Sequence, residues 1–345
     1  MLYEMKFYQA AAYQFVNVIK VGNNQYIQKA LEKLALAADV LNDETLLNYA
    51  LQRIKIDEFP TKMRDLLAYR VGEYHYRLAQ FDKAAQYLGR VPAGSANFQE
   101  AKYLEALSLA EQNNTAGALR SFATLVKSNR GTIVTDNNRV AGLMGIARVY
   151  YQQKKWDKSI EYYRRIPRDS EFWHDAIFEL SWAELRASKF RGVLSNFHSL
   201  HSPYYEDFYL PESVLLRSIV YLYICRYDEM EKTIELYDRV YGPVLRSLTE
   251  YLKANQKNTE KLGMDFERIA KNYDELKSDP KKRGALPVPF IIMRKVLREG
   301  DVQNNKKFSD RLREEQRVLA AESENWKRSP VGIFVAKALD NRLRA

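Results

Sequence analysis

Two segments of the chain carry almost the same phrase. "LAQFDKAAQYLGRVP" runs from Leu78 to Pro92, and "KKWDKSIEYYRRIP" runs from Lys154 to Pro167. Both contain an aromatic residue followed by Asp, Lys and a small residue, then a tyrosine, and then Arg, an apolar residue and Pro. Such self-similarity constrains the fold more than composition does, because it marks chains built from one repeated supersecondary unit.

The aromatic residue of the phrase is an anchor from which the repeat can be followed. Successive anchors are 34, 34, 41, 34 and 37 residues apart, and about 34 residues is the length of one kind of helix–turn–helix repeat. The two longer intervals contain loop-like insertions at residues 128–138 and 201–211. The six anchors are Leu47, Phe81, Thr115, Trp156, Phe190 and Tyr227.

Two columns recur around the anchors and predict how the helices of each unit touch. A small residue nine positions before the anchor lets two helices approach closely, and a large residue seven positions after it fills the adjoining space. The small column is Ala38, Gly72, Ala106, Ala147, Ser181 and Ser218. The large column is Ile54, Leu88, Phe122, Tyr163, Phe197 and Ile234. The chain is therefore expected to turn near Asp43, Gln80, Asn113, Lys154, Lys189 and Arg226.

These columns resemble the tetratricopeptide repeat (TPR) superfamily over residues 29–243. The resemblance is strongest around Phe81 and Trp156 and weakest at both ends of that range. It implies an all-α fold, a right-handed superhelical solenoid of helix–turn–helix hairpins. We expect residues 1–28 to form an N-terminal capping helix and residues 29–243 to form about six repeats. Residues 244–345 are expected to be a basic helical region that packs on the end of the array as a C-terminal cap.

The positive charge of the chain is concentrated in this C-terminal region. Of the net charge of +10, residues 253–345 contribute +8, with 22 Lys and Arg against 14 Asp and Glu. Such an excess is typical of a solvated surface, or of contact with nucleic acid, acidic lipid or an acidic partner. Lys281, Lys282 and Arg283, in a proline-containing loop, form the candidate basic surface.

No motif for catalysis or metal binding appears in the sequence. The single cysteine, Cys225, excludes an intrachain disulfide and a cysteine metal cluster. His198 and His201 are three residues apart, but no carboxylate or cysteine accompanies them at ligand spacing, so we interpret them as packing or surface histidines. Phosphate loops, dinucleotide fingerprints and zinc-protease motifs are absent. We therefore predict a protein that is not an enzyme and has no catalytic residue, cofactor or metal.

The sequence does not select one cellular compartment for the protein. No run approaches about 18 apolar residues, so no transmembrane helix is expected. The first residues lack the pattern of a signal peptide. A processed or trimmed chain would look the same, which leaves the periplasm or cell envelope beside the cytoplasm.

The resemblance also implies a binding site. In the TPR superfamily the first helix of each repeat lines an inner groove, and ligand-facing side chains stand at fixed offsets. Those offsets select mainly aromatic residues and arginines, the residue types that anchor protein interfaces; the alternative is that some of the tyrosines only pack between hairpins. The expected groove residues are Tyr69, Tyr76, Arg77, Tyr103, Met144, Arg148, Tyr151, Phe178, Trp182, Arg186 and Tyr223. Tyr103, Tyr151 and Trp182 are expected to face one channel without belonging to the core.

Two functions are compatible with the sequence. The first is a scaffold or adaptor that binds a protein segment, extended or helical, in the aromatic groove. The second is a helical-repeat protein that binds single-stranded RNA, which is less favoured because residues 1–252 carry a net charge of only +2. Residues 169–229 also resemble repeat proteins that serve multiprotein machines in bacterial cell envelopes. Neither the partner nor the oligomeric state follows from the sequence.

Overall fold

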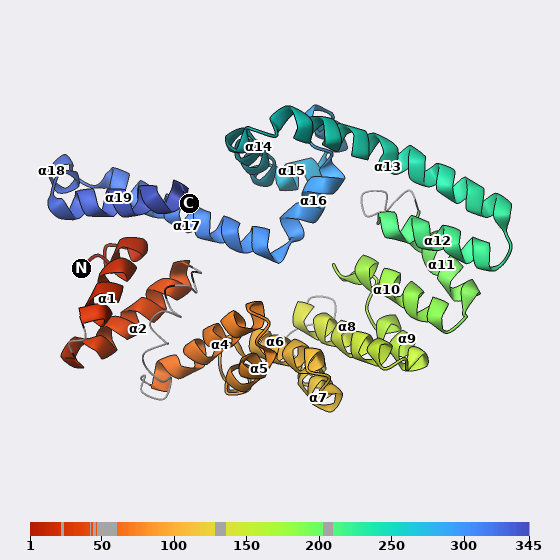
Figure 1. Cartoon of the computed structure of the whole chain (residues 1–345), viewed down its shortest axis with the longest axis horizontal. Helices are drawn as coiled ribbons and strands as arrows, with labels where there is room; N and C mark the ends of the chain where they lie inside the picture. The colour runs from red at the N-terminus through yellow and green to blue at the C-terminus, as the bar shows by residue number, and fades with distance from the viewer. Residues whose placement is uncertain are drawn as a thin grey trace. The chain divides into compact units, whose positions relative to one another are not determined.

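The computed structural model describes residues 1–21, 24–41, 43, 46, 61–127, 136–202 and 210–344. These residues form an all-α protein of helical repeats (Figure 1). The helices from the N-terminus to the last repeat hairpin are α1 (Tyr8–Val21), α2 (Asn24–Leu41), α4 (Thr61–Arg77), α5 (Phe81–Leu88), α6 (Phe98–Glu111), α7 (Thr115–Val126), α8 (Asn137–Gln152), α9 (Trp156–Arg164), α10 (Trp173–Arg186), α11 (Phe190–Leu200), α12 (Pro211–Tyr223) and α13 (Tyr227–Asn255). The remaining elements are α14 (Thr259–Lys271), α15 (Tyr273–Ser278), the 3-10 helix η3 (Pro280–Ala285), α16 (Phe290–Arg298), α17 (Gly300–Ala321), α18 (Glu324–Lys327) and α19 (Pro330–Arg344).

The predicted turns are confirmed. All six positions at which the repeat register requires a turn lie outside helices. Five of the second helices begin at their anchors, as α5 does at Phe81 and α9 at Trp156. The first anchor, Leu47, lies outside the described residues, together with the rest of the second helix expected for that repeat.

The five described turns between a first and a second repeat helix share one backbone conformation. Two positions before each anchor, the chain adopts a positive φ between 55° and 60°. In the first of these turns the Ala79 N–H donates to the Tyr76 carbonyl and the Gln80 N–H donates to the His75 carbonyl. This pair of bonds is the Schellman motif, which satisfies carbonyls at a helix C-terminus. None of the five residues is glycine; they are Ala79, Asn113, Lys154, Ser188 and Cys225.

Ala79→Gly is expected to stabilise the protein by about 0.5–1 kcal/mol. A left-handed conformation costs an L-residue roughly 1–2 kcal/mol, and glycine avoids this cost while adding entropy to the unfolded chain. Asn113→Gly is the matched control, because asparagine tolerates the left-handed region better. Urea unfolding measures both changes, and an equal response of the two variants would contradict this explanation.

The packing columns are also confirmed for their described members, except in the last repeat; Ile54, the first member of the large column, lies outside the described residues. The described members of the small column are buried, and Leu88, Phe122, Tyr163 and Phe197 of the large column are at most 4% exposed. Gly72 shows how close the helices are, since a Cβ atom at this position would lie 2.5 Å from Leu88 Cγ. Ile234, in the last repeat, is instead 47% exposed.

The described chain divides into two compact units. The first contains residues 1–125 and 300–345, and the second contains residues 126–299. These boundaries differ from those of the three segments expected from the sequence, because residues 244–299 remain with the last repeats while residues 300–345 join the first helices. No helix in the described ranges is both long and apolar enough to span a membrane.

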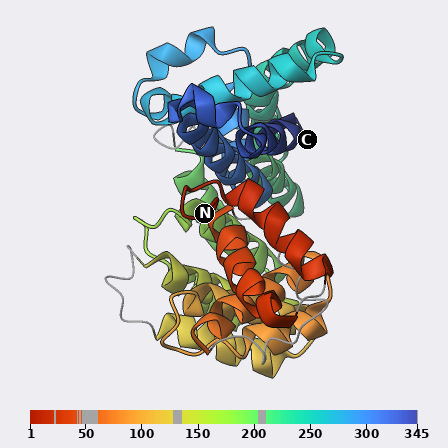
Figure 2. The same ribbon diagram turned by 90° about the vertical axis from the view of Figure 1, so that its left-hand side faces the viewer.

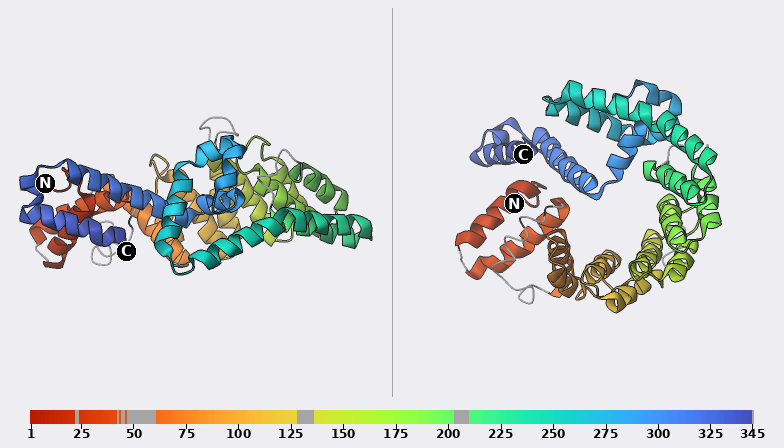
Figure 3. Two further views of the ribbon diagram at one scale, coloured as in Figure 1. Left: turned by 90° about the horizontal axis from the view of Figure 1, so that it is seen from above. Right: turned by 45° about the vertical axis from the view of Figure 1, so that its right-hand side comes forward.

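In the first unit, the C-terminal helices cover the N-terminal hairpin (Figures 2 and 3). Phe7 and Leu41 are buried in one apolar cluster with Leu312, Val335 and Leu339. The ring of Phe7 also stacks on Trp326 with a centroid distance of 5.4 Å. The α1/α2 hairpin therefore receives its apolar cover from helices α17–α19, more than 250 residues away in the sequence.

Two buried acidic side chains link the C-terminal helices to the α1/α2 hairpin. Glu315 of α17 is 3% exposed and accepts hydrogen bonds from the Gln9 N–H, at 3.1 and 3.2 Å, in the first turn of α1. Burial raises the pKa of Glu315 to about 8, although the backbone N–H groups of Gln9 and Tyr8 act in the opposite direction. Asp43, beyond the end of α2, accepts from Arg342 of α19 at 2.9 Å. Helices α17 and α19 therefore contact the α1/α2 hairpin where it begins and where it ends in the sequence.

Candidate partner-binding site

The second unit presents aromatic and apolar side chains on the first helices of three successive repeats, α8, α10 and α12. The second helices, α9 and α11, bury their own apolar faces against these first helices. Eight of the aromatic, apolar and arginine side chains on these three first helices are half-buried or exposed. We name this set the A-helix surface; it consists of Arg148, Tyr151, Phe178, Trp182, Arg186, Leu215, Ile219 and Tyr223.

The α12 end of the A-helix surface is the most exposed. Leu215 is 57% exposed and Tyr223 is 68% exposed. Ile219, one turn after Leu215, is half-buried. The ring of Tyr223 stacks on Phe190 with a centroid distance of 6.3 Å, which orients it without burying it. The repeat offsets selected Tyr223 but missed Leu222, which is 51% exposed beside it.

The residues on α8 and α10 are less accessible than the sequence led us to expect. Phe178 and Trp182 are half-buried and pack against the apolar cluster of Val193 and Phe197. Tyr151 is half-buried, with an edge-to-face contact to Trp156 at 5.0 Å. Trp182 and Tyr151 are therefore partly core residues, and truncating Trp182 is expected to cost stability as well as affinity.

Met144 does not belong to the A-helix surface. It is 3% exposed and lies in the cluster with Leu143 and Ala147. Met144 is buried because every residue of α8 from 142 to 147 is buried. This turn of the helix has no free face on which a ligand-facing side chain could lie.

An ion pair joins two first helices in the second unit. Arg148 of α8 donates to both carboxylate oxygens of Glu179 of α10, at 2.8 and 2.6 Å. The Tyr163 hydroxyl donates to the same carboxylate at 2.7 Å. Burial, followed by the charge of Glu179, raises the pKa of Tyr163 far above its ordinary value, so the phenol remains a donor. Arg148 keeps an exposed face but is positioned by the protein itself.

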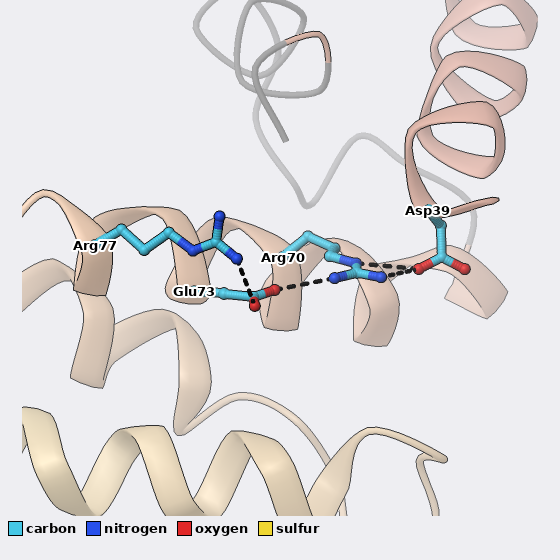
Figure 4. Close-up of polar contacts among 4 residues, drawn as sticks. All are labelled: Asp39, Arg70, Glu73 and Arg77. Carbon is cyan, nitrogen blue, oxygen red and sulfur yellow. Dashed lines mark hydrogen bonds and ion pairs between the residues drawn. The ribbon is translucent and has the colours of Figure 1, made fainter. Parts of the chain in front are cut away.

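The first unit contains a related polar network, drawn in Figure 4. Arg70 of α4 donates to Asp39 of α2 through Nε at 3.0 Å and to Glu73 at 3.0 Å. Arg77, an expected groove residue, donates to Glu73 at 3.3 Å. The network crosses the α2–α4 contact and leaves Arg77 exposed at its outer end.

The ion pairs of the two units occupy the same repeat positions. In both, one partner stands eight residues before its anchor and the other stands eleven residues before the next anchor, so the partners are 31 residues apart. The charges are reversed, with Asp39 and Arg70 in the first unit and Arg148 and Glu179 in the second. Opposite charges at this spacing are the sequence signal that would have identified Glu179.

The three tyrosines expected in the first unit are half-buried. Tyr69 and Tyr76 pack against the cluster around Leu88. Tyr103 contacts Phe122 with a ring distance of 6.0 Å. These contacts are typical of tyrosines that pack between hairpins, with one edge left at the surface.

The candidate basic surface is partly occupied by contacts within the chain. Lys282 pairs with Glu275. Arg283 donates to the carbonyls of Leu276 and Lys277, at 2.7 and 2.9 Å, and lies over the ring of Phe290. Arg283 therefore connects η3 to α15 and α16, while Lys281 is exposed.

His201 is a packing histidine, as the sequence indicated. Its ring stacks on Phe197 with centroids 5.5 Å apart, and Nε2 lies 2.8 Å from the Ser213 hydroxyl. Burial, followed by the charge of Arg217, lowers the pKa of His201 to about 4. The imidazole is therefore neutral at physiological pH, which suits its position between α11 and α12. Cys225 is exposed in its turn.

Comparison with known families agrees with this architecture. Residues 141–169, which span most of α8 and all of α9, match the model of a tetratricopeptide repeat. No curated protein shows significant similarity to the chain. The matched segment is one of the two in which the repeated phrase is clearest, and the neighbouring hairpins keep its register of turns and buried columns. Residues 141–169 are therefore similar to a tetratricopeptide repeat.

Proposed function

We propose that the chain is a non-enzymatic scaffold whose A-helix surface binds a segment of a partner protein within a multiprotein complex. The observation that carries this proposal is the exposure of Leu215 and Tyr223, about two turns apart on α12, in the repeat that follows the half-buried aromatic residues of α10. Rigid aromatic and apolar side chains beside arginines are the composition of interface hot spots. A bacterial cell-envelope location for the complex rests only on the resemblance of residues 169–229.

The test uses a displayed library of random peptides, selected against the full chain. Tyr223→Ala and Leu215→Ala are each expected to weaken the selected peptides by about 30-fold, corresponding to about 2 kcal/mol. Because both side chains are largely exposed, neither change should alter the unfolding transition. Arg191→Ala, at an exposed position on the second helix α11, is the matched control and should leave affinity unchanged.

The RNA alternative makes a different prediction in the same binding assay. A single-stranded RNA that binds through phosphate contacts would lose affinity steeply with added salt. We expect little salt dependence for peptides, because the A-helix surface is mainly aromatic and aliphatic, and two of the three candidate basic residues contact their own chain. Tight, salt-sensitive RNA binding that survives Tyr223→Ala would overturn the scaffold proposal.

A further inference from the structure

The second helix of the last repeat, α13, has an exposed apolar face. The equivalent faces of the second helices α5, α9 and α11 are buried. In α5, α9 and α11, the residue seven positions after the anchor is covered by the following helix, as Phe197 is by Leu216 and Val220 of α12. Ile234 holds this position in α13 and is 47% exposed, and Tyr237, three residues later, is 38% exposed. Terminal repeats normally carry a polar outer face or a cap.

The exposed apolar residues of α13 lie along one line. Tyr227, Ile234, Leu245 and Leu252 are separated by 7, 11 and 7 residues and are between 47% and 65% exposed. At 3.6 residues per turn, each of these steps returns to within about 20° of the same side, so the four form a ridge roughly 37 Å long. Pro243 lies on the opposite side of the helix, so its ring is not part of the ridge.

The spacing of the ridge is symmetric about its midpoint. If a second α13 lies antiparallel on the first, Tyr227 faces Leu252 of the other copy and Ile234 faces Leu245. Each contact then occurs twice, which is the requirement for a two-fold interface in which the same patch is used by both copies.

The charges along one side of the ridge are also self-complementary. Glu231, Glu235 and Asp238 follow the ridge in its first half, and Arg246 and Lys253 continue the same side in its second half. All five are exposed, and within the described part of the chain none of them forms an ion pair. In an antiparallel pair related by a two-fold axis, equivalent flanks meet, so the acidic half of each copy faces the basic half of the other. Such complementarity orients partners and sets their register.

We propose that the chain forms a two-fold symmetric dimer by antiparallel pairing of its α13 ridges. The occupant of the ridge is thus a second copy of the chain, which covers the apolar column that the array leaves open. A single helix pair of this length falls among the smaller protein interfaces, so dissociation constants of roughly 10–100 µM are expected. None of the four ridge residues belongs to the A-helix surface.

Sedimentation velocity over a concentration series tests the pairing. The wild-type chain is expected to shift from monomer to dimer, and Ile234→Glu to weaken dimerisation at least 30-fold because each dimer would contain two buried carboxylates. Leu78→Glu is the matched control, since Leu78 is an apolar residue of the first unit with 49% exposure, and it should dimerise like the wild type. Far-ultraviolet circular dichroism would verify that each variant is folded.

A charge exchange tests the antiparallel register independently of the apolar residues. One variant carries Glu231→Arg and Glu235→Arg, and a second carries Arg246→Glu and Lys253→Glu. Each alone should lose the dimer, because the flanks that meet then have like charge. A mixture of the two variants should form a mixed dimer, and all four changes in one chain should restore self-association.

The following results would contradict the proposed dimer. A wild-type chain that stays monomeric at concentrations well above roughly 100 µM, or a dimer that persists in Ile234→Glu, would overturn the proposal. Failure of the charge-exchange mixture to associate would overturn the antiparallel pairing. The dimer proposal would also be wrong if the chain is monomeric and a helix of another protein covers the ridge. That result would not affect the peptide-binding test of the A-helix surface.

Discussion

Replacing Glu315 by glutamine is expected to remove a pH dependence of stability on the order of 4–5 kcal/mol. The pKa of Glu315 rises from 4.5 to about 8 on folding, because the carboxyl is buried. Between these two values the unfolded chain has released the proton and the folded chain still holds it. The folded state therefore binds more protons, and this group makes the protein less stable as pH rises from 4.5 to 8.

The measurement is the free energy of unfolding of the first unit in urea at pH 5 and pH 8.5, for the wild type and for Glu315→Gln. The variant should lose less stability between these two pH values than the wild type, since the amide oxygen still accepts from Gln9 and the amide does not ionise. Glu314→Gln, the same change at an exposed neighbour, is the control and should follow the wild type. Identical pH profiles for Glu315→Gln and the wild type would refute the assignment.

Gly72→Ala is expected to destabilise the first unit by about 2–3 kcal/mol, although alanine is the better helix former by about 1 kcal/mol. The new Cβ would lie 2.5 Å from Leu88 Cγ and 3.2 Å from the Leu88 backbone nitrogen. Leu88 has no exposed surface, so its side chain cannot turn away without moving α5. Close-packed interiors resist added volume because neighbouring side chains have no space into which they can shift.

Gly94→Ala provides the comparison in the same unit. A Cβ atom at Gly94 would meet nothing within 4 Å, so this variant should match or slightly exceed the wild type in stability. Chemical denaturation of both variants decides the matter. If Gly72→Ala were as stable as Gly94→Ala, the small column would not mark helix contacts in this array.

The sequence was sufficient for features that follow from one packing rule applied in every repeat. Turns near Gln80 and Lys154 were predictable because the same close contact, small residue against large residue, recurs in each hairpin. The rule failed at Ile234, because burial of that position depends on a helix that would follow, and no sequence column shows whether that helix is present.

Features that depend on neighbours outside the repeat could not be predicted. Met144 stands at a ligand-facing offset, yet its turn of α8 is buried on every residue from 142 to 147. The contact between Glu315 and Gln9 joins residues 306 positions apart, and neither residue carries a local signal of the other. For the A-helix surface, the repeat offsets located the helices correctly, but the degree of exposure at Trp182 and Tyr151 depended on the volume of the adjacent side chains.

The discontinuous first unit has a consequence for synthesis on the ribosome. Residues 126–299 form one contiguous unit and can complete their core as soon as they emerge. Phe7 and Leu41 emerge earlier but remain without their cover until Leu339 has been added. Domains of most proteins fold in the order in which they are made; here the segment made first must finish last. A nascent chain that stops before residue 300 would leave the beginning of the protein open to chaperones and proteases, with its second unit already folded.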